Sequence, residues 1–251
     1  MTAPLLETRA LGREFGALQA LSDVTLAVAP RELRAVIGPN GAGKTTFFHL
    51  LSGILRPTRG EILFRGETVT ALPAHARCRR GISRTFQVTS LFPELSVLEN
   101  VRLAIQAKHG GNTRLLGGRG LLARTRARAH EALGFFGLAD RPGVAAGTLP
   151  HGDQRLLEIA MALAQEPELL LLDEPTQGLA SEETAATVEF IRRIAREQGL
   201  TILLVEHDMD VVFNLADRVS VLHFGQLIAE GSPEEIRRNP EVQRAYLGET
   251  E

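Results

Sequence analysis

The residues best suited to chemistry in this chain form a glycine-rich stretch that ends in a lysine and a threonine. In order they are Gly38, Pro39, Asn40, Gly41, Ala42, Gly43, Lys44 and Thr45. Glycines let the backbone turn its N–H groups inward, and a helix that begins behind them adds a favourable dipole, so the stretch is suited to binding phosphate groups. In such a loop the lysine neutralises phosphates and the threonine hydroxyl binds Mg²⁺. A plain glycine turn is the alternative that the stretch alone leaves open.

A second set of reactive residues follows a run of leucines. Residues 169–172 are all leucine and lead directly into Asp173 and Glu174. If the leucines form a buried strand, both acids lie at its carboxyl end, where open α/β sheets bind ligands. Asp173 would then bind Mg²⁺ and Glu174 would polarise an attacking water, as phosphoryl transfer requires. Such a pair serves as a helix N-cap equally often, so only its occurrence together with the glycine-rich stretch favours catalysis.

The elements that must position these residues follow an alternating order of strands and helices. Residues 33–37 predict a strand that runs into the glycine-rich loop, a helix follows Lys44, and residues 60–64 predict the next strand. Later strands are expected at 168–172, 201–205, 218–222 and 227–229, with helices at 182–198 and 209–215 between them. Short β-rich stretches open the chain at 5–11 and 24–28. The order predicts an α/β fold with a parallel sheet.

Between residues 88 and 158 the pattern becomes mainly helical. Helices are expected at 97–107 and 121–136, separated by two clusters of glycine. The run Arg124, Arg126, Arg128 favours a solvated helix face over a nucleic-acid patch. The whole chain has 28 basic and 30 acidic residues, so its net charge of −2 gives no overall attraction to nucleic acid or to an anionic membrane.

Cysteine content and hydropathy indicate the compartment. Cys78 is the single cysteine, which excludes an internal disulfide framework and fits a reducing compartment. The N-terminus has no basic segment ahead of an apolar core, so no secretory signal is expected. No apolar run reaches the roughly 18–20 residues of a membrane helix. We therefore expect a cytoplasmic chain that reaches a membrane only from outside the bilayer.

Five elements in a fixed order give the chain a resemblance to a known family. They are the glycine-rich loop, Gln87 within 84–87, the segment 149–154, the acids Asp173 and Glu174, and His207 within 205–208. This order resembles the ATP-binding cassettes of ABC transporters across nearly the whole chain. The resemblance implies one domain over 1–251, with a P-loop NTPase core and N-terminal antiparallel β subdomain (1–87 and 159–251) and a helical subdomain (88–158).

The resemblance also implies roles for single residues around ATP and Mg²⁺. The expected catalytic residues are Glu174, His207, Gln87 and Lys44, and the expected metal ligands are Thr45, Gln87 and Asp173. Phe15 would stack on adenine, His207 would contact the γ-phosphate, and Thr46 would join the phosphate loop. Without the family context, Phe15 would more often be a core residue and His207 a structural hydrogen-bonding residue.

Segment 149–154 matches the family's signature motif, which contacts ATP held by a second cassette. His151, Gly152 and Asp153 are therefore expected to bind nucleotide across a two-fold interface, with Gly152 offering its N–H at the start of helix 153–164. Two departures stand out. Pro150 replaces the usual serine and has neither a hydroxyl nor an N–H to donate. The loop 178–181 has Ala180 where the family commonly has aspartate.

Local features favour one branch of the family, the ATP-binding subunits of branched-chain amino-acid importers. These features are the sequence Arg84 to Gln87, the glycine-rich insert before Leu121, and the C-terminal stretches 239–242 and 245–248. The expected partners are transmembrane permease subunits, a second cassette (the same chain or a paralogue) and, indirectly, a substrate-binding protein, with no nucleic acid. The expected location is peripheral, on the cytoplasmic face of the inner membrane.

Several alternatives remain open at this level. Importers of urea or short amides share much of the pattern, and the cytosolic ATPase of lipopolysaccharide export shares less of it around Gln87 and in the insert. A soluble cassette of translation or DNA repair usually has two cassettes or a coiled-coil insert, which this sequence lacks. A nucleotide-binding regulator that barely hydrolyses is suggested by Pro150 and Ala180, against the complete set of expected catalytic residues.

Overall fold

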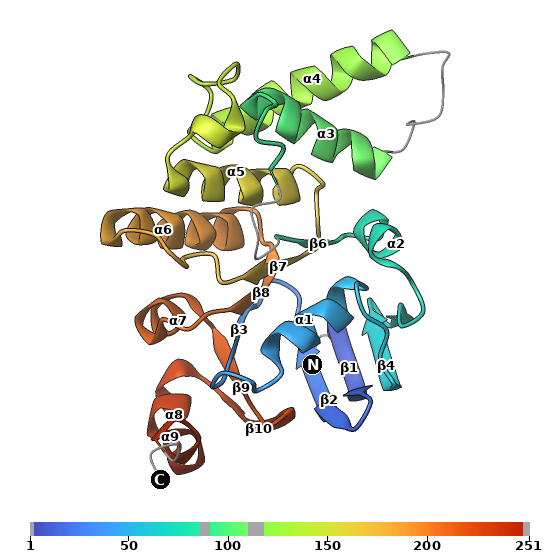
Figure 1. The fold of residues 1–251 in the computed structure, drawn as a ribbon, viewed down its shortest axis with the longest axis vertical. Coiled ribbons are helices and arrows are strands. Elements are labelled where there is room, and N and C mark those ends of the chain that lie inside the picture. The colour runs from blue at the N-terminus through green and yellow to red at the C-terminus, as the bar shows by residue number, and fades with distance from the viewer. Residues whose placement is uncertain (1–2, 86–90, 110–117, 248–251) are drawn as a thin grey trace.

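The centre of the molecule is a six-stranded sheet, seen in a computed structural model that describes residues 3–85, 91–109 and 118–247 (Figure 1). The strand order is β10-β9-β3-β8-β7-β6. The strands are β3 (Leu33–Ile37), β6 (Ile82–Arg84), β7 (Leu169–Asp173), β8 (Thr201–Val205), β9 (Arg218–His223) and β10 (Gln226–Gly231). Each neighbouring pair is parallel except β10 with β9, which is antiparallel. The mainly parallel sheet that the sequence predicts is confirmed.

A second, antiparallel sheet is built from the N-terminal strands. It has the order β2-β1-β4-β5, with β1 (Leu6–Phe15), β2 (Leu18–Val28), β4 (Arg59–Phe64) and β5 (Glu67–Thr68). This confirms the antiparallel β subdomain. The sequence predicted β2 only from residue 24, but the strand begins at Leu18 because the hairpin pairs Leu18 with Phe15. Pairing with β1 therefore extends the strand through residues whose hydropathy alone gave no signal.

The central strands separate two hydrophobic cores. Side chains alternate between the faces of a strand, so Leu170 and Leu172 of β7 enter one core while Leu169 and Leu171 enter the other. All residues of β3, β7 and β8 are buried. Helix α1 (Lys44–Ser52) contributes Phe47 and Phe48 to the core that also receives the side chains of β1 and β2. The helix that follows the glycine-rich loop is thus fixed along its buried side.

The C-terminal end of α1 is closed by an arginine from helix α2 (Ala74–Arg79). The guanidinium of Arg77 donates hydrogen bonds to the backbone oxygens of Leu50 (2.6 Å) and Leu51 (2.8 Å). It is 1% exposed, and burial lowers the pKa of Arg77 to about 10. Because the last carbonyls of a helix have no partner within it, Arg77 satisfies groups that would otherwise be buried unpaired.

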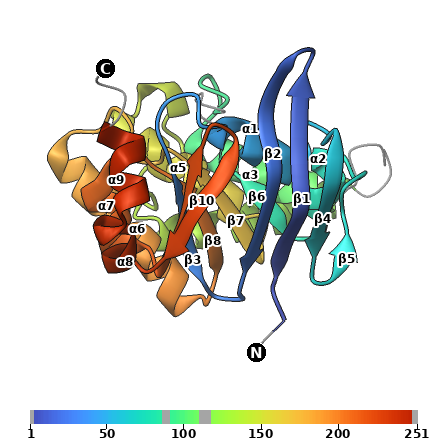
Figure 2. The ribbon, with the colours of Figure 1, turned by 90° about the horizontal axis from the view of Figure 1, so that it is seen from below.

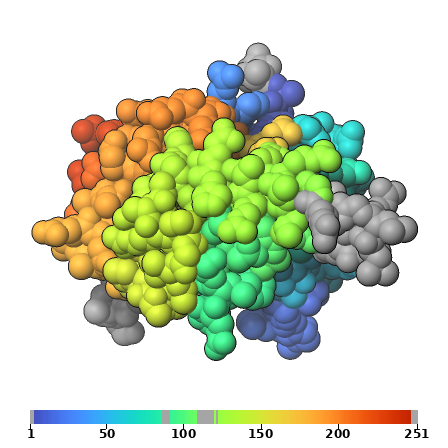
Figure 3. Space-filling view, turned by 90° about the horizontal axis from the view of Figure 1, so that it is seen from above, coloured from blue at the N-terminus to red at the C-terminus, as the bar shows by residue number. Residues whose placement is uncertain are grey.

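The remaining helices cover the other face and one end of the sheet. The core carries α6 (Ser181–Glu197), α7 (Met209–Leu215), α8 (Pro233–Arg238) and α9 (Pro240–Leu247). The expected helical insert contains α3 (Val97–His109), α4 (Gly118–Phe135), the short η1 (Ala146–Thr148) and α5 (His151–Leu163). Seen from above, α3 and α4 cover this end of the molecule (Figure 3). Within the described ranges, no helix is long and apolar enough to cross a membrane.

The boundaries proposed for the helical subdomain remain predictions. Helix α5 runs across the expected division between residues 158 and 159, and the start at residue 88 lies outside the described residues. The predicted helix 121–136 corresponds to α4, which begins three residues earlier, at Gly118. The predicted helix 153–164 corresponds to α5, which begins at His151.

Candidate functional site

The glycine-rich loop connects the carboxyl end of β3 to the first turn of α1, and its glycines are required by close packing. A Cβ atom on Gly38 would lie 2.1 Å from the backbone oxygen of Leu222, and Gly38 has φ +153°. A Cβ on Gly43 would lie 2.7 Å from the backbone oxygen of Ala20, with φ +99°. The loop therefore packs against β2 and β9, and only glycine fits at these two positions.

Lys44, the first residue of α1, lies folded over the loop. Its Nζ donates hydrogen bonds to the backbone oxygens of Gly38 (2.5 Å) and Pro39 (2.9 Å). Burial lowers the pKa of Lys44, and the nearby carboxylates of Glu174 and Asp173 act in the opposite direction. The ammonium group is thus held at the loop by carbonyl groups. A phosphate in the loop would offer it a stronger, charged acceptor in the same place.

The two acids lie at the carboxyl end of β7, as the sequence predicts, but in different surroundings. Asp173 has no exposed surface, and its Oδ2 accepts a hydrogen bond of 2.6 Å from Arg84 Nη2. Its Oδ1 is buried with no hydrogen-bond partner in the described part of the chain. An unsatisfied buried oxygen is costly, and carboxylate oxygen is the ligand that Mg²⁺ prefers. The residues present therefore fit a magnesium ion beside Oδ1.

Glu174 contacts the second predicted catalytic residue. A hydrogen bond of 2.6 Å joins its Oε1 to Nε2 of His207, whose side chain is 45% exposed. Glu174 has φ +48°, an uncommon conformation for a residue with a side chain. The main chain holds it there, because its N–H donates to Val205 O (2.9 Å) and its carbonyl accepts from Arg155. The sequence predicted both residues near the γ-phosphate without predicting this contact between them.

His207 is positioned by the turn that leads from β8 to α7. Asp208 caps α7, since its Oδ1 accepts hydrogen bonds from the N–H groups of Asp210 (2.9 Å) and Val211 (3.3 Å). The preceding Glu206 accepts from His207 N (3.0 Å) and from Thr176 N (2.9 Å). Glu206 therefore joins the turn after β8 to the segment after β7, so the carboxyl ends of these two strands are held together.

A cavity of ≈ 500 Å³ collects most of the predicted site residues. Phe15, the loop residues Asn40 to Lys44, Thr45, Thr46, Glu174 and His207 all line it. Phe15 is 42% exposed, so it is not a core residue, and the Arg13 guanidinium lies 4.5 Å from its ring centre. Sequence reasoning missed five lining residues, namely Leu18, Gln19, Ala20, Phe224 and Gly225. Phe224 and Gly225 lie between two predicted strands, whereas no sequence signal marked Leu18, Gln19 and Ala20.

The residues of the signature segment do not line this cavity. Pro150 is the N-cap of α5, and His151 is the first residue of that helix. The N–H of Gly152 donates a hydrogen bond of 3.1 Å to Oε1 of Glu183, a residue in the first turn of α6. Asp153 accepts a hydrogen bond of 2.5 Å from Arg141. Gln87 lies outside the described residues.

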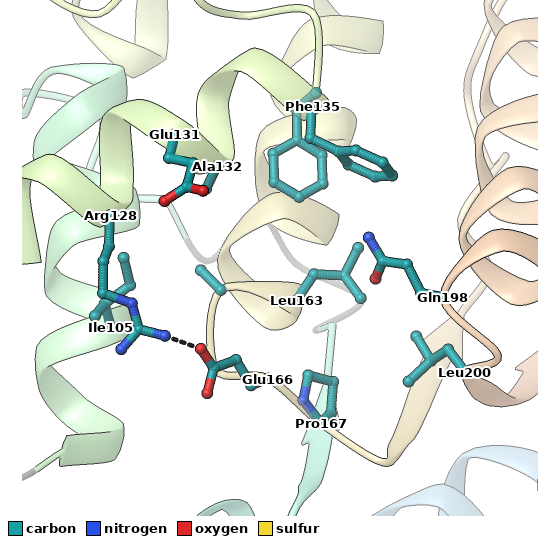
Figure 4. A pocket seen from close by; sticks show the side chains of 12 residues that line it. Ile105, Arg128, Glu131, Ala132, Phe135, Leu163, Glu166, Pro167, Gln198 and Leu200 are labelled. Atoms are coloured by element: carbon teal, nitrogen blue, oxygen red, sulfur yellow. Dashed lines mark ion pairs between the residues drawn. The ribbon is translucent and has the colours of Figure 1, made fainter.

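A separate cavity of ≈ 490 Å³ lies where α3 and α4 meet the core (Figure 4). Glu166, in the turn between α5 and β7, forms an ion pair with Arg128 of α4. The backbone oxygen of Glu166 accepts a hydrogen bond of 2.9 Å from Lys108 Nζ of α3. None of the predicted site residues lines this cavity. It marks the seam along which the helical insert contacts the core.

The chain belongs to the ABC transporter family, whose sequence profile matches residues 21–177. The profile of the branched-chain amino acid ATP-binding cassette transporter matches residues 226–251. The branched-chain transport protein LivG of Escherichia coli is 43% identical over 99% of this chain and 100% of its own length. BraF of Pseudomonas aeruginosa, also a branched-chain amino acid transport ATP-binding protein, is 41% identical with the same coverage.

The chain is also similar to an export cassette and to cassettes of solved structure. The lipopolysaccharide export protein LptB of Haemophilus influenzae is 31% identical over 98% of each chain. A solved nucleotide-free cassette of an ABC transporter has a TM-score of 0.86 and 30% identity, over 98% of this chain and 99% of its own. The ADP form of the cassette MJ1267 has a TM-score of 0.85 and 29% identity, over 98% and 100%. The predicted fold and the predicted likeness to the branched-chain branch are both confirmed.

Proposed function

We propose that this chain binds and hydrolyses ATP with Mg²⁺ as the motor subunit of an ABC importer for branched-chain amino acids or related small amides. The observation that carries the proposal is the cavity in which the glycine-rich loop, Lys44 and the Glu174–His207 pair meet. The cavity brings together groups that can bind phosphate, an acid that can position water and a histidine, and positioning and charge stabilisation are what phosphoryl transfer needs. The relatives named for branched-chain transport supply the cargo class.

Each residue has a defined part in the proposed reaction. The loop N–H groups hold the phosphates, and Lys44 transfers its hydrogen bonds from the carbonyls of Gly38 and Pro39 to the β- and γ-phosphates. Thr45, Asp173 and Gln87 would hold Mg²⁺, which would supply neutralisation of the phosphate charge. Glu174 accepts a hydrogen bond from the attacking water, and His207 donates to the γ-phosphate. Both groups must first exchange their present hydrogen bond for these new partners.

The proposed partners are a second cassette and permease subunits. A solved dimer of the cassette MJ0796 in a post-hydrolysis state with ADP and Pi matches this chain with a TM-score of 0.77 and 26% identity, over 91% and 98% of the two chains. Because His151, Gly152 and Asp153 lie outside this chain's own cavity, we propose that they contact ATP held by a second cassette. Peripheral attachment at the cytoplasmic face, through permeases served by a substrate-binding protein, completes the proposal.

Substitution of Glu174 tests the catalytic assignment. We expect Glu174→Gln to bind ATP and accumulate as a dimer while turnover falls by at least about a hundredfold, the scale for loss of a general base. Steady-state phosphate release and size-exclusion chromatography measure both effects. Unchanged turnover in this variant would reject the role of Glu174.

Copurification of the tagged chain with a permease tests the transport role, and a chain that always purifies alone would argue against it.

A further inference from the structure

The turn between β9 and β10 forms part of the wall of the proposed nucleotide cavity. Phe224 and Gly225, which make up this turn, line the same cavity as Phe15 and the glycine-rich loop. Figure 2 shows β2 between β10 and β1. Phe15 at the end of β1, Ala20 of β2 and Phe224 just before β10 all line the cavity.

The turn is fixed against the loop by its main chain. Gly225 N–H donates a hydrogen bond of 3.1 Å to the backbone oxygen of Ala42, and Ser22 N–H donates one of 2.8 Å to the oxygen of Gly225. A Cβ on Gly225 would lie 2.6 Å from the oxygen of Ala20, so the approach is as close as the backbone allows. The backbone that carries the Phe224 ring is consequently held in register with the phosphate loop.

The backbone conformation of this turn disfavours phenylalanine. Phe224 has φ +43° and Gly225 has φ +75°, a two-residue hairpin in which both φ angles are positive. Such hairpins favour asparagine followed by glycine, and other residues pay about 1–2 kcal/mol for this conformation. The side chain is 76% exposed, so burial does not offset this cost. The ring contacts the adjacent His223 ring (centroids 4.3 Å apart), and most of its surface still faces solvent. Strained residues whose side chains stay exposed are found preferentially at ligand sites.

We propose that Phe224 contacts the bound nucleotide, with its ring against the ribose and base rather than the phosphates. An aromatic ring offers apolar surface and a π face, which suit a nucleoside, and it offers no donor to a phosphate. The loop N–H groups and Lys44 already provide the phosphate contacts. This inference rests on the proposed nucleotide binding and adds a second aromatic residue to the one that the sequence predicted.

The test compares ADP with inorganic tripolyphosphate as ligands of the full chain, by calorimetry at concentrations where the chain is a monomer. We expect Phe224→Ala to weaken ADP binding by about three- to tenfold, the effect of losing one aromatic contact. Tripolyphosphate affinity should stay within about twofold, because it engages the loop alone. Phe92→Ala is the matched control, since Phe92 is also exposed (52%) but does not line the cavity.

A second variant separates binding from folding. Phe224→Asn should raise the midpoint of thermal unfolding by about 2–4 °C, because asparagine suits the turn, while weakening ADP as much as alanine does. Equal ADP affinity in parent and Phe224→Ala would overturn the inference and leave the proposed function intact. An equal loss of affinity for tripolyphosphate would also overturn it, because it would indicate a damaged loop. An effect of the substitution on ATP-dependent dimerisation alone would overturn it too, because the ring would then contact a second copy. A parent chain that binds no ADP would overturn both.

Discussion

At the scale of single residues, the most informative pair is Arg84 with Asp173. Arg84 lies at the end of β6, and its guanidinium donates to Asp173 Oδ2 (2.6 Å) and to Ser52 Oγ of α1 (3.1 Å). The side chains are 5% and 0% exposed. One carboxylate oxygen is therefore bound by the protein, while Oδ1 is buried without a hydrogen-bond partner in the described part of the chain. The arginine fixes the orientation of the proposed metal ligand.

Breaking this pair should be costly. Arg84→Met leaves a buried carboxylate without its counter-charge, so we expect a loss of about 3–5 kcal/mol in unfolding free energy, and Arg84→Met with Asp173→Asn should recover much of it. The midpoint of urea unfolding measures both. Arg65→Met is the control, because the Arg65–Glu168 pair is exposed and should contribute less than about 1 kcal/mol. A single variant as stable as the parent would contradict the role of Arg84.

The residues that sequence reasoning could find are those whose chemistry depends on local order. The loop, Asp173 and Glu174 were predicted because a glycine turn and a strand end already define their places, whereas His207 was predicted from the resemblance to the family. The Arg84–Asp173 bond, the Glu174–His207 bond and the closure of α1 by Arg77 join residues far apart in the chain. No spacing rule predicts such contacts, because tertiary packing alone determines them.

At the scale of elements, the start of α5 departs most from the family pattern. Pro150 caps the helix with φ −53° and ψ 153° and makes no side-chain hydrogen bond. Gly152 N–H, expected to face a second copy's γ-phosphate, is instead bound to Glu183 Oε1, and Glu183 Oε2 accepts from Ala180 N (3.0 Å). Glu183 thereby links the N-terminus of α5 to the loop that precedes α6.

Replacing the proline tests whether the missing serine limits activity. Serine at an N-cap accepts a backbone hydrogen bond and adds about 1 kcal/mol, while loss of proline costs a similar or smaller amount through the unfolded chain. We therefore expect Pro150→Ser to leave stability almost unchanged and not to lower the rate of ATP hydrolysis. A steady-state assay measures the rate. A large decrease in the rate would show that the proline itself is needed for activity, for a reason that its present contacts do not explain.

Replacing the glutamate tests the contact at Gly152. The carboxylate of Glu183 accepts the hydrogen bond of the Gly152 N–H, which a second copy's phosphate would otherwise accept, and its negative charge repels that phosphate. We expect Glu183→Gln, in the slow Glu174→Gln background, to dimerise at a severalfold lower ATP concentration than the background alone. Light scattering during an ATP titration gives the midpoint. A higher midpoint would show that the carboxylate supports the dimer instead of competing with it.

At the scale of the whole molecule, the N-terminus of α5 lies outside the proposed nucleotide cavity, although α5 packs into the same hydrophobic core as β7 and β8. The cavity lies where the two sheets meet, whereas α5 packs with α3 and α6 and is joined to the core beside the Arg128–Glu166 pair (Figure 4). The sequence predicted the parallel sheet and the helical insert, because each has its own periodicity. It could not predict their seam, which depends on side chains from four separate segments. One chain thus presents a phosphate loop and a helix N-terminus as two distinct surfaces.

The central claim is that the glycine-rich loop and Lys44 bind a nucleotide triphosphate. Calorimetric titration of the purified, folded chain with Mg-ATP tests it most directly, with Lys44→Ala as the comparison and circular dichroism as the check on folding. We predict one bound ATP per chain and affinity at least about tenfold weaker in the variant, the effect of losing one hydrogen bond from a charged donor. A folded parent chain that gives no binding heat at any temperature tried, or equal affinity in both proteins, would contradict the claim.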